Sequence, residues 1–331
     1  MLLDVFKRQT FRYNDEMVDS VVKSGFESWI DSQFVIPPSY LLDSLYSIYD
    51  QSLAIWVANG NSSDNYPWRP NHVHMDYTWW QIAVRAEDQL RQRVAEALSQ
   101  IVVTSLNSDL SGYSDGMAYF YDILIEHALG NYLDLLQDVT RSPAMGVYLT
   151  YVNNPASDTI AMTFPDENYA RECMQLFTIG LDSLNLDGTP ALDGMGNRIP
   201  TYDNDDIAEF AKIFTGLSYA DRIDEFDPYW GMGIWSADLR QPMVMYESYH
   251  EQGPKYLLHG YVVPDGQTGI EDVEDAIEHL FNHPNVGPFV CHQLIQRLVK
   301  SNPTPAYVEA VASAFNDNGS GVRGDMKAVV K

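Results

Sequence analysis

One helix predicted from the sequence, over residues 168–179, carries residue types that could do chemistry. Asn168, Arg171 and Glu172 are three and four positions apart, so a helix places them on one face. A carboxylate held beside a guanidinium stays ionised and can orient a substrate or a metal ion. The same spacing also fits an ion pair that only fastens this helix to its neighbours. If the group is functional, we expect Asn168 to bind a substrate and Arg171 and Glu172 to act in catalysis.

The segment YHEQGPKYLLHG, residues 249–260, supplies a second pair of candidate catalytic residues. His250 could act as a general acid or base, and Lys255 could anchor an anion. The alternative is a turn at Gly253 and Pro254 beside a histidine with a structural role. Ordered loops carry more than their share of functional residues, so both interpretations stay open. A catalytic site requires His250 to meet Arg171 and Glu172 in an open cleft.

An acidic loop between residues 182 and 206 offers hard oxygen ligands, which calcium prefers. The candidate metal ligands are Asp187, Asp193, Asn197, Asp203 and Asp205. The spacing is not that of an EF-hand, because Gly194 stands where the bidentate glutamate belongs. The alternative is that the Asp-Gly pairs make turns and that Asp203 caps a helix. Calcium is the cofactor that the loop predicts.

Two further segments could bind a ligand. In the aromatic loop 226–246, Trp230 and Trp235 could stack on sugar rings if they are exposed, although aromatic residues under a long loop are more often buried. In NHVHMD, residues 71–76, a strand would point His72 and His74 to one side, where they could share a metal ion. No further ligand motif follows them, which favours ordinary loop histidines.

Composition and missing motifs exclude several classes of function. The 331 residues include 20 Lys and Arg against 46 Asp and Glu, a formal net charge of -26. Such a chain repels nucleic acid and anionic membrane surfaces. No apolar run approaches the roughly 18 residues that a membrane-spanning helix needs, so we expect no membrane insertion. The sequence has no nucleophile elbow, P-loop, dinucleotide-binding glycine motif or HExxH motif.

The elements that would position these residues are mostly helices. Apolar periodicity and caps predict helices over 14–33, 43–58, 77–105, 115–127, 131–140, 168–179, 203–217, 269–282, 286–300 and 304–316. A β-hairpin or ordered loop is expected around 184–202. The chain is therefore expected to be mainly α, as a single large helical domain over 1–331 that could divide into 1–150 and 151–331. A last helix from Asp325 reaches the end of the chain, which suggests truncation.

Several long segments, taken in order, resemble one known family. Residues 88–103, 142–149, 167–181, 185–207 and 281–299 are similar to the domain-of-unknown-function 1800 family of bacterial proteins. The resemblance implies an α-helical fold, export to the periplasm or outside, and a neighbouring exported protein with a sulfatase-like or phosphatase-like fold as a partner. The family activity is not established. This chain departs from the family in having no signal peptide.

Three functions follow as hypotheses. The first is an exported protein that is hydrolase-like, or accessory to an exported hydrolase, with a polar pocket and a calcium-binding loop. The second is an extracellular module that binds a glycan or a protein through the aromatic loop 226–246. The third is a structural protein without catalytic activity. Exposed indoles at Trp230 and Trp235 would favour the second, and burial of both would exclude it.

Overall fold

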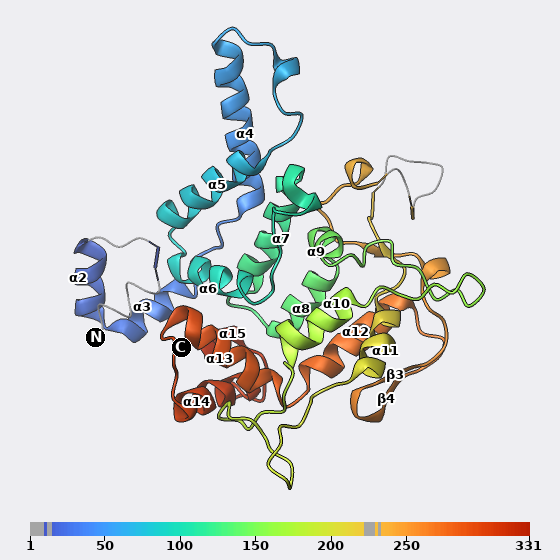
Figure 1. Cartoon of the computed structure of the whole chain (residues 1–331). Helices are drawn as coiled ribbons and strands as arrows, with labels where there is room; N and C mark the ends of the chain where they lie inside the picture. The colour runs from blue at the N-terminus through green and yellow to red at the C-terminus, as the bar shows by residue number, and fades with distance from the viewer. Residues whose placement is uncertain (1–9, 12–14, 222–228, 231–232) are drawn as a thin grey trace.

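The computed structural model describes residues 10–11, 15–221, 229–230 and 233–331. Helices dominate it, as predicted (Figure 1). The α-helices are α2 (Asp15–Ser24), α3 (Phe26–Gln33), α4 (Leu41–Ala58), α5 (His72–Arg85), α6 (Gln89–Ser99), α7 (Ser114–His127), α8 (Tyr132–Thr140), α9 (Pro143–Tyr148), α10 (Asn168–Glu172), α11 (Asn204–Ile213), α12 (Gly269–Phe281), α13 (Val286–Leu298), α14 (Pro305–Asn316) and α15 (Met326–Val330). One π-helical turn, η3 (Cys173–Thr178), continues α10.

Strands are short and pair in twos. β1 (Leu217–Ser218) pairs antiparallel with β2 (Val244–Met245), and β3 (Lys255–Leu257) pairs antiparallel with β4 (Tyr261–Val263). The segment predicted as a hairpin or ordered loop is held by single bridges, Asp182 to Pro200, Leu184 to Pro190 and Leu192 to Arg198. It is therefore an ordered loop that leaves the helical body rather than a strand pair.

A continuous apolar core joins α3 to α15. The stripe predicted within 77–105 is buried as expected, with Leu90, Val94, Leu98 and Ile101 all at most 2% exposed. The helix predicted over 77–105 is nevertheless interrupted, because α5 ends at Arg85 and α6 begins at Gln89. The helix predicted over 14–33 is likewise divided at Gly25, whose φ of 87° lies outside the helical range.

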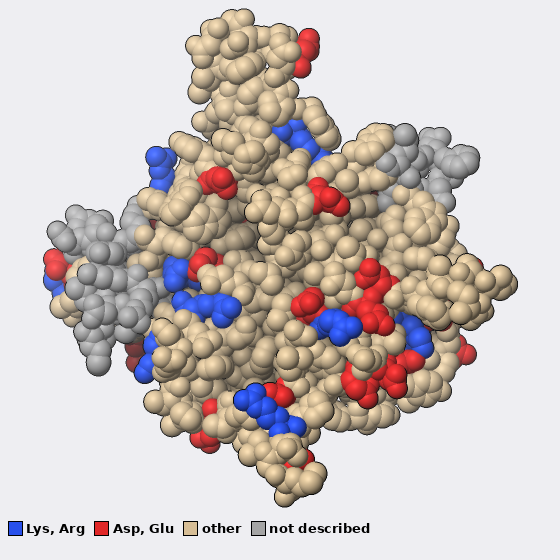
Figure 2. Space-filling model, viewed as in Figure 1, with Lys and Arg blue, Asp and Glu red and all other residues tan. Residues whose placement is uncertain are grey.

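α4 and α5 rise from the body as a projection, seen at the top of Figure 1. The base of α4 is fixed by α7, because the Asp122 carboxylate accepts hydrogen bonds from the backbone N–H groups of Leu41 at 2.6 Å and Leu42 at 3.0 Å. Only Leu41 and Leu45 of α4 are buried. Figure 2 shows few charged side chains on the projection, whereas acidic side chains gather on the body. The outer part of α4 is thus an apolar helix with little of its surface covered.

The strand considered for His72 and His74 is wrong, because both residues lie in the first turn of α5. Asn71 caps this helix, and its side chain accepts a hydrogen bond from the backbone N–H of Val73 at 3.1 Å. A helix turns about 100° per residue, so the two histidines point in different directions. His72 is exposed and His74 is buried.

Candidate functional site

The predicted catalytic residues do not share an open cleft. Arg171 pairs with Glu167 on the surface of the same helix, at 3.2 Å. Glu172 lines a small cavity of about 240 Å³ beside Tyr148 and Leu176. His250 is buried elsewhere among other partners. The structure brings together only the pair His250 and Lys255.

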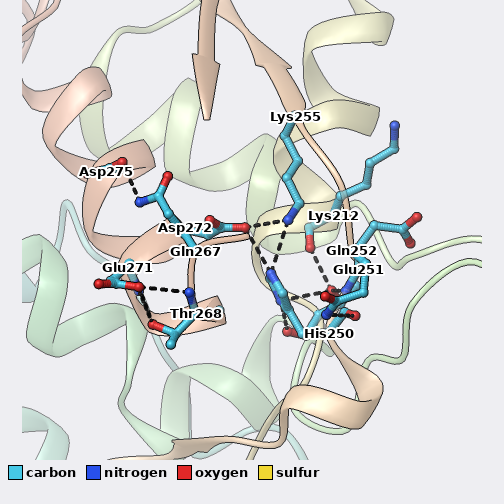
Figure 3. Close-up of polar contacts among 12 residues, drawn as sticks. Lys212, His250, Glu251, Gln252, Lys255, Gln267, Thr268, Glu271, Asp272 and Asp275 are labelled. Atoms are coloured by element: carbon cyan, nitrogen blue, oxygen red, sulfur yellow. Dashed lines mark hydrogen bonds and ion pairs between the residues drawn. The ribbon is translucent and has the colours of Figure 1, made fainter. Parts of the chain in front are cut away.

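Asp272, on α12, completes a buried polar cluster with that pair (Figure 3). The Nε2 atom of His250 lies 3.0 Å from Asp272 Oδ2 and 3.2 Å from the Nζ atom of Lys255, and Lys255 also forms an ion pair with Asp272. His250 Nδ1 donates to the carbonyl oxygen of Thr215 at 2.9 Å. The exposed fractions of His250, Lys255 and Asp272 are 2%, 2% and 1%. A substrate has no access to these side chains in this conformation.

The charges of the cluster are balanced within it. Burial raises the pKa of Asp272, but hydrogen bonds from His250 and Lys255 outweigh burial, so its pKa lies below the ordinary value. The second carboxylate oxygen, Oδ1, is buried without a hydrogen-bond partner. Asp272 therefore depends on the side chains of His250 and Lys255, which meet its other oxygen. The cluster joins α12 to β3 and, through Thr215, to the segment that follows α11.

The acidic loop uses its side chains in turns. Oδ1 of Asp187 accepts from the backbone N–H and the hydroxyl of Thr189, at 2.9 and 2.6 Å. Oδ1 of Asp193 accepts from the backbone N–H groups of Met195 and Asn197, both at 2.8 Å. These hydrogen bonds hold the pKa of each carboxyl below its usual value. They are the turn contacts that Asp and Asn commonly make, here in one half-buried and one exposed turn.

Asp203 caps α11, as the alternative interpretation of the acidic loop predicts. Its side chain accepts from the backbone N–H groups of Asp205 and Asp206 at the start of α11, and the Asp206 carboxylate accepts in return from the backbone N–H of Asp203. Within the described ranges, no group of three or more His, Cys, Asp or Glu side chains is placed to hold a metal ion. Calcium binding by this loop stays a prediction.

The predicted substrate-binding residues lie at the surface. Trp230 and Trp235 are 46% and 52% exposed. The ring of Trp230 meets Tyr229 edge-on, with ring centroids 5.0 Å apart. The Asn168 side-chain amide lies 3.5 Å from the Thr150 hydroxyl. Phe226, at the start of the predicted aromatic loop, is outside the described residues.

A site that the sequence did not predict lies between α4 and α5. It is an open groove of about 650 Å³, lined by Ile48, Gln51, Ser52, Ile55, Tyr66, Pro67, Asn71, Val73, His74, Tyr77, Gln81 and Arg85. One wall is a row of α5 side chains four residues apart, Val73, Tyr77, Gln81 and Arg85. The opposite wall comes from α4. A volume of this size is typical of small-molecule sites.

One wall of the groove holds a polar cluster around His74. Its Nε2 atom lies 2.8 Å from the Tyr66 hydroxyl and 3.1 Å from the Ser52 hydroxyl, and its Nδ1 atom lies 2.8 Å from the Oδ1 atom of Asn71. Burial, and to a smaller extent the neighbouring His72, lowers the pKa of His74. His74 is therefore neutral at neutral pH and can accept or donate one hydrogen bond at Nε2.

Arg85 stands at the end of the α5 row. It is exposed and makes no hydrogen bond or ion pair with any other residue in the part of the chain that the structure describes. One sequence signal could have pointed to the groove: the 18 residues of α4 include only two charged side chains, Asp43 and Asp50. Such a helix is apolar on more than one face, which is unusual for a helix at a protein surface.

Comparisons with known proteins give a family and nothing closer. A family model described as a protein of unknown function, DUF1800, matches residues 4–331. No curated protein matches the chain. No solved structure matches it either. Among the described residues, no helix is both long enough and apolar enough to cross a membrane.

Proposed function

Since the chain belongs to the DUF1800 family, whose description assigns no activity, we propose a function from its own geometry. The protein binds small amphipathic molecules that carry an acidic group, in the groove between α4 and α5. The observation that carries this proposal is an open groove of about 650 Å³ whose walls carry both apolar and polar side chains, with an arginine at one end that pairs with no other described residue.

The apolar part of such a ligand would lie along Ile48, Ile55, Val73 and Tyr77. Burial of hydrocarbon contributes about 0.8 kcal/mol for each CH₂ group, so a chain of modest length supplies useful affinity. The hydroxyl groups of Ser52 and Tyr66 and the His74 ring offer hydrogen bonds on the wall. A few polar groups in an apolar groove are the usual way of fixing a ligand's orientation.

Arg85 would select the acidic group. The whole chain has a net charge of -26, which disfavours anions in general. The projection carries little of that charge, and charges on the body are screened beyond about 8 Å in physiological salt. The Arg85 guanidinium, which has no partner among the described residues, can therefore act locally on a carboxylate or sulfonate.

A displacement titration tests this proposal. The probe is 1-anilinonaphthalene-8-sulfonate, whose fluorescence rises in apolar sites, and the competitors are dodecanoate and dodecanol. We expect dodecanoate to displace the probe at lower concentration than dodecanol. In Arg85→Gln the advantage of dodecanoate falls about threefold, whereas Lys300→Gln, which removes an exposed cation elsewhere, leaves it unchanged. If the two competitors displace the probe equally from the wild type, Arg85 does not select the acidic group. If the probe does not bind at all, the groove is not a ligand site.

The exposed indoles of Trp230 and Trp235 favour a second candidate, binding of a glycan. Aromatic rings at a protein surface provide apolar faces on which sugar rings can stack. Titration with a panel of soluble oligosaccharides should quench tryptophan fluorescence in the wild type. Trp235→Ala should reduce the quenching if this surface binds sugar.

Three finer proposals rest on the family resemblance. They are export to the periplasm or outside, hydrolytic activity or support of a hydrolase, and a neighbouring exported sulfatase-like or phosphatase-like partner. Fractionation of a bacterium that makes the protein tests the first proposal. Co-purification from the exported fraction tests the partner, and a panel of ester and phosphoester substrates tests hydrolysis.

A further inference from the structure

Helix α5 has a second apolar face, on the side opposite its buried face. Met75, Thr78 and Ile82 are buried against the body. Val73, Tyr77, Trp80 and Val84 lie on the outer side and are 60%, 63%, 61% and 43% exposed. Side chains at i, i+4, i+7 and i+11 form one stripe on a helix, the arrangement that packs against another helix. We call these four residues the outer stripe.

The spacing of the outer stripe is symmetric. Its steps are four, three and four residues, so the stripe reads the same in both chain directions. A two-fold axis midway between positions 78 and 79 would place Val73 opposite Val84 and Tyr77 opposite Trp80. The stripe is therefore complementary to an antiparallel copy of itself, which is what an interface with two-fold symmetry requires.

The charges on and around α5 also favour a second copy of the chain as the partner of the outer stripe. In that register Asp76 lies opposite Gln81 and Arg85 lies opposite His72, so no two carboxylates or two arginines face each other. Two molecules with a net charge of -26 repel each other over most of their surface. The projection, residues 41–85, has a formal charge of only -2, from four Asp (Asp43, Asp50, Asp64 and Asp76) and two Arg (Arg69 and Arg85), so it is a surface where two copies can approach.

We propose that a second copy of the chain covers the outer stripe, with the two α5 helices packed antiparallel about a two-fold axis. One helix face is smaller than the roughly 800 Å² per partner of a standard stable interface, so the dimer forms and dissociates with concentration. Added salt tightens it, because salt screens the repulsion between the two acidic bodies. Val73 and Tyr77 also line the groove, whereas Trp80 and Val84 do not, so substitutions at positions 80 and 84 separate association of two copies from ligand binding.

Sedimentation velocity over a range of protein concentrations tests the proposal. We expect the wild type to shift from monomer to dimer. Trp80→Glu should weaken association at least about tenfold, because a central tryptophan commonly dominates an interface. Val84→Glu should weaken it less. Met195→Glu, which adds the same charge at an exposed apolar residue outside α5, should leave association unchanged.

A mixing experiment tests the register. Tyr77→Glu and Trp80→Lys are each expected to associate weakly, and an equimolar mixture should associate more tightly than either alone, because Glu at 77 then faces Lys at 80. Far-ultraviolet circular dichroism and probe binding by Trp80→Glu show that the variant is folded. A wild type that stays monomeric at all concentrations, or a Trp80→Glu protein that associates as tightly as the wild type, overturns the proposal.

Discussion

Two histidines in this protein lie in similar polar clusters, but only one of them can be reached by a ligand. His250 contacts Asp272, Lys255 and Thr215 inside the body. His74 contacts Tyr66, Ser52 and Asn71 on the wall of an open groove. Both rings have partners at both nitrogens. Only the second faces a space that a ligand can enter.

The comparison shows that residue types do not decide whether a cluster is a site. His250, Lys255 and Asp272 are the residue types expected of a catalytic centre, yet their burial and mutual contacts describe a structural network that joins α12, β3 and Thr215 just after α11. Ser, Tyr, Asn and His around His74 carry less charge but border about 650 Å³ of open space. We therefore expect stability to depend on the first cluster and ligand binding to depend on the groove.

The largest loss of stability should come from Lys255→Met. This change leaves the buried carboxylate of Asp272 without its ammonium partner, a loss that typically costs 3–5 kcal/mol. Urea unfolding monitored by circular dichroism measures it. Lys212→Met, which breaks a more exposed ion pair with Glu209, should cost less than about 1 kcal/mol.

A double variant distinguishes the loss of charge pairing from other damage to the fold in Lys255→Met. Replacing both partners, as Lys255→Met with Asp272→Leu, removes the uncompensated charge and should be less destabilised than Lys255→Met alone. If the double variant is less stable than the single one, the carboxylate is not the source of the loss.

The next effect should come from Ile55→Glu in the groove. Ile55 is 63% exposed, so the fold loses little, and unfolding should change by less than about 0.5 kcal/mol. A carboxylate in the apolar wall should weaken probe binding about tenfold, since it must lose water and repels an acidic ligand. Unchanged affinity would place the bound probe elsewhere.

Mild acid should lower the stability of the protein by a smaller amount, through protonation of His74. Burial lowers the pKa of His74, so the unfolded chain takes up a proton near pH 6.5 that the folded chain resists. The stability that the neutral His74 ring contributes is therefore fully present above pH 6.5. It is lost as the pH falls through the lower pKa of the ring in the folded protein. Urea midpoints between about pH 7.5 and pH 5.5 should fall less in His74→Gln than in the wild type. An equal fall in both proteins would contradict burial as the cause.

Calcium should have the smallest effect. If the acidic loop binds it, a site of millimolar affinity at millimolar calcium raises the melting temperature by less than about 1 °C relative to chelator. Asp193→Asn should remove that increase, whereas Asp43→Asn on α4 should retain it. The same melting temperature with calcium and with chelator would contradict calcium binding, and the acidic side chains would then serve only to form turns.

Local patterns in the sequence predicted much of the fold. The helix class, the buried stripe of α6 and the α11 helix follow from apolar periodicity, with Ile207 and Phe210 buried as their spacing requires. Asp203 as a cap and the ordered loop after residue 182 follow from turn and cap chemistry. These features depend on residues close together in the chain, which is why a single sequence indicates them.

The partners of His250 and the groove depend on contacts between distant segments. Asp272 lies 22 residues after His250 and looks like an ordinary first-turn acid of α12. Ser52 and His74 meet only because α4 and α5 lie side by side. The strand considered for His72 and His74 was wrong because alternation over a few residues is weak and the cap at Asn71 starts a helix instead.

Covalent mapping of the bound ligand tests the central claim most directly. A dodecanoate analogue with a photoreactive group on its chain would be irradiated with the protein, and the labelled peptides identified by mass spectrometry. We predict that label falls in α4 and α5, within residues 41–85, and that excess dodecanoate suppresses it. Label confined to the body, or spread without suppression by dodecanoate, would contradict the assignment of the groove as the binding site.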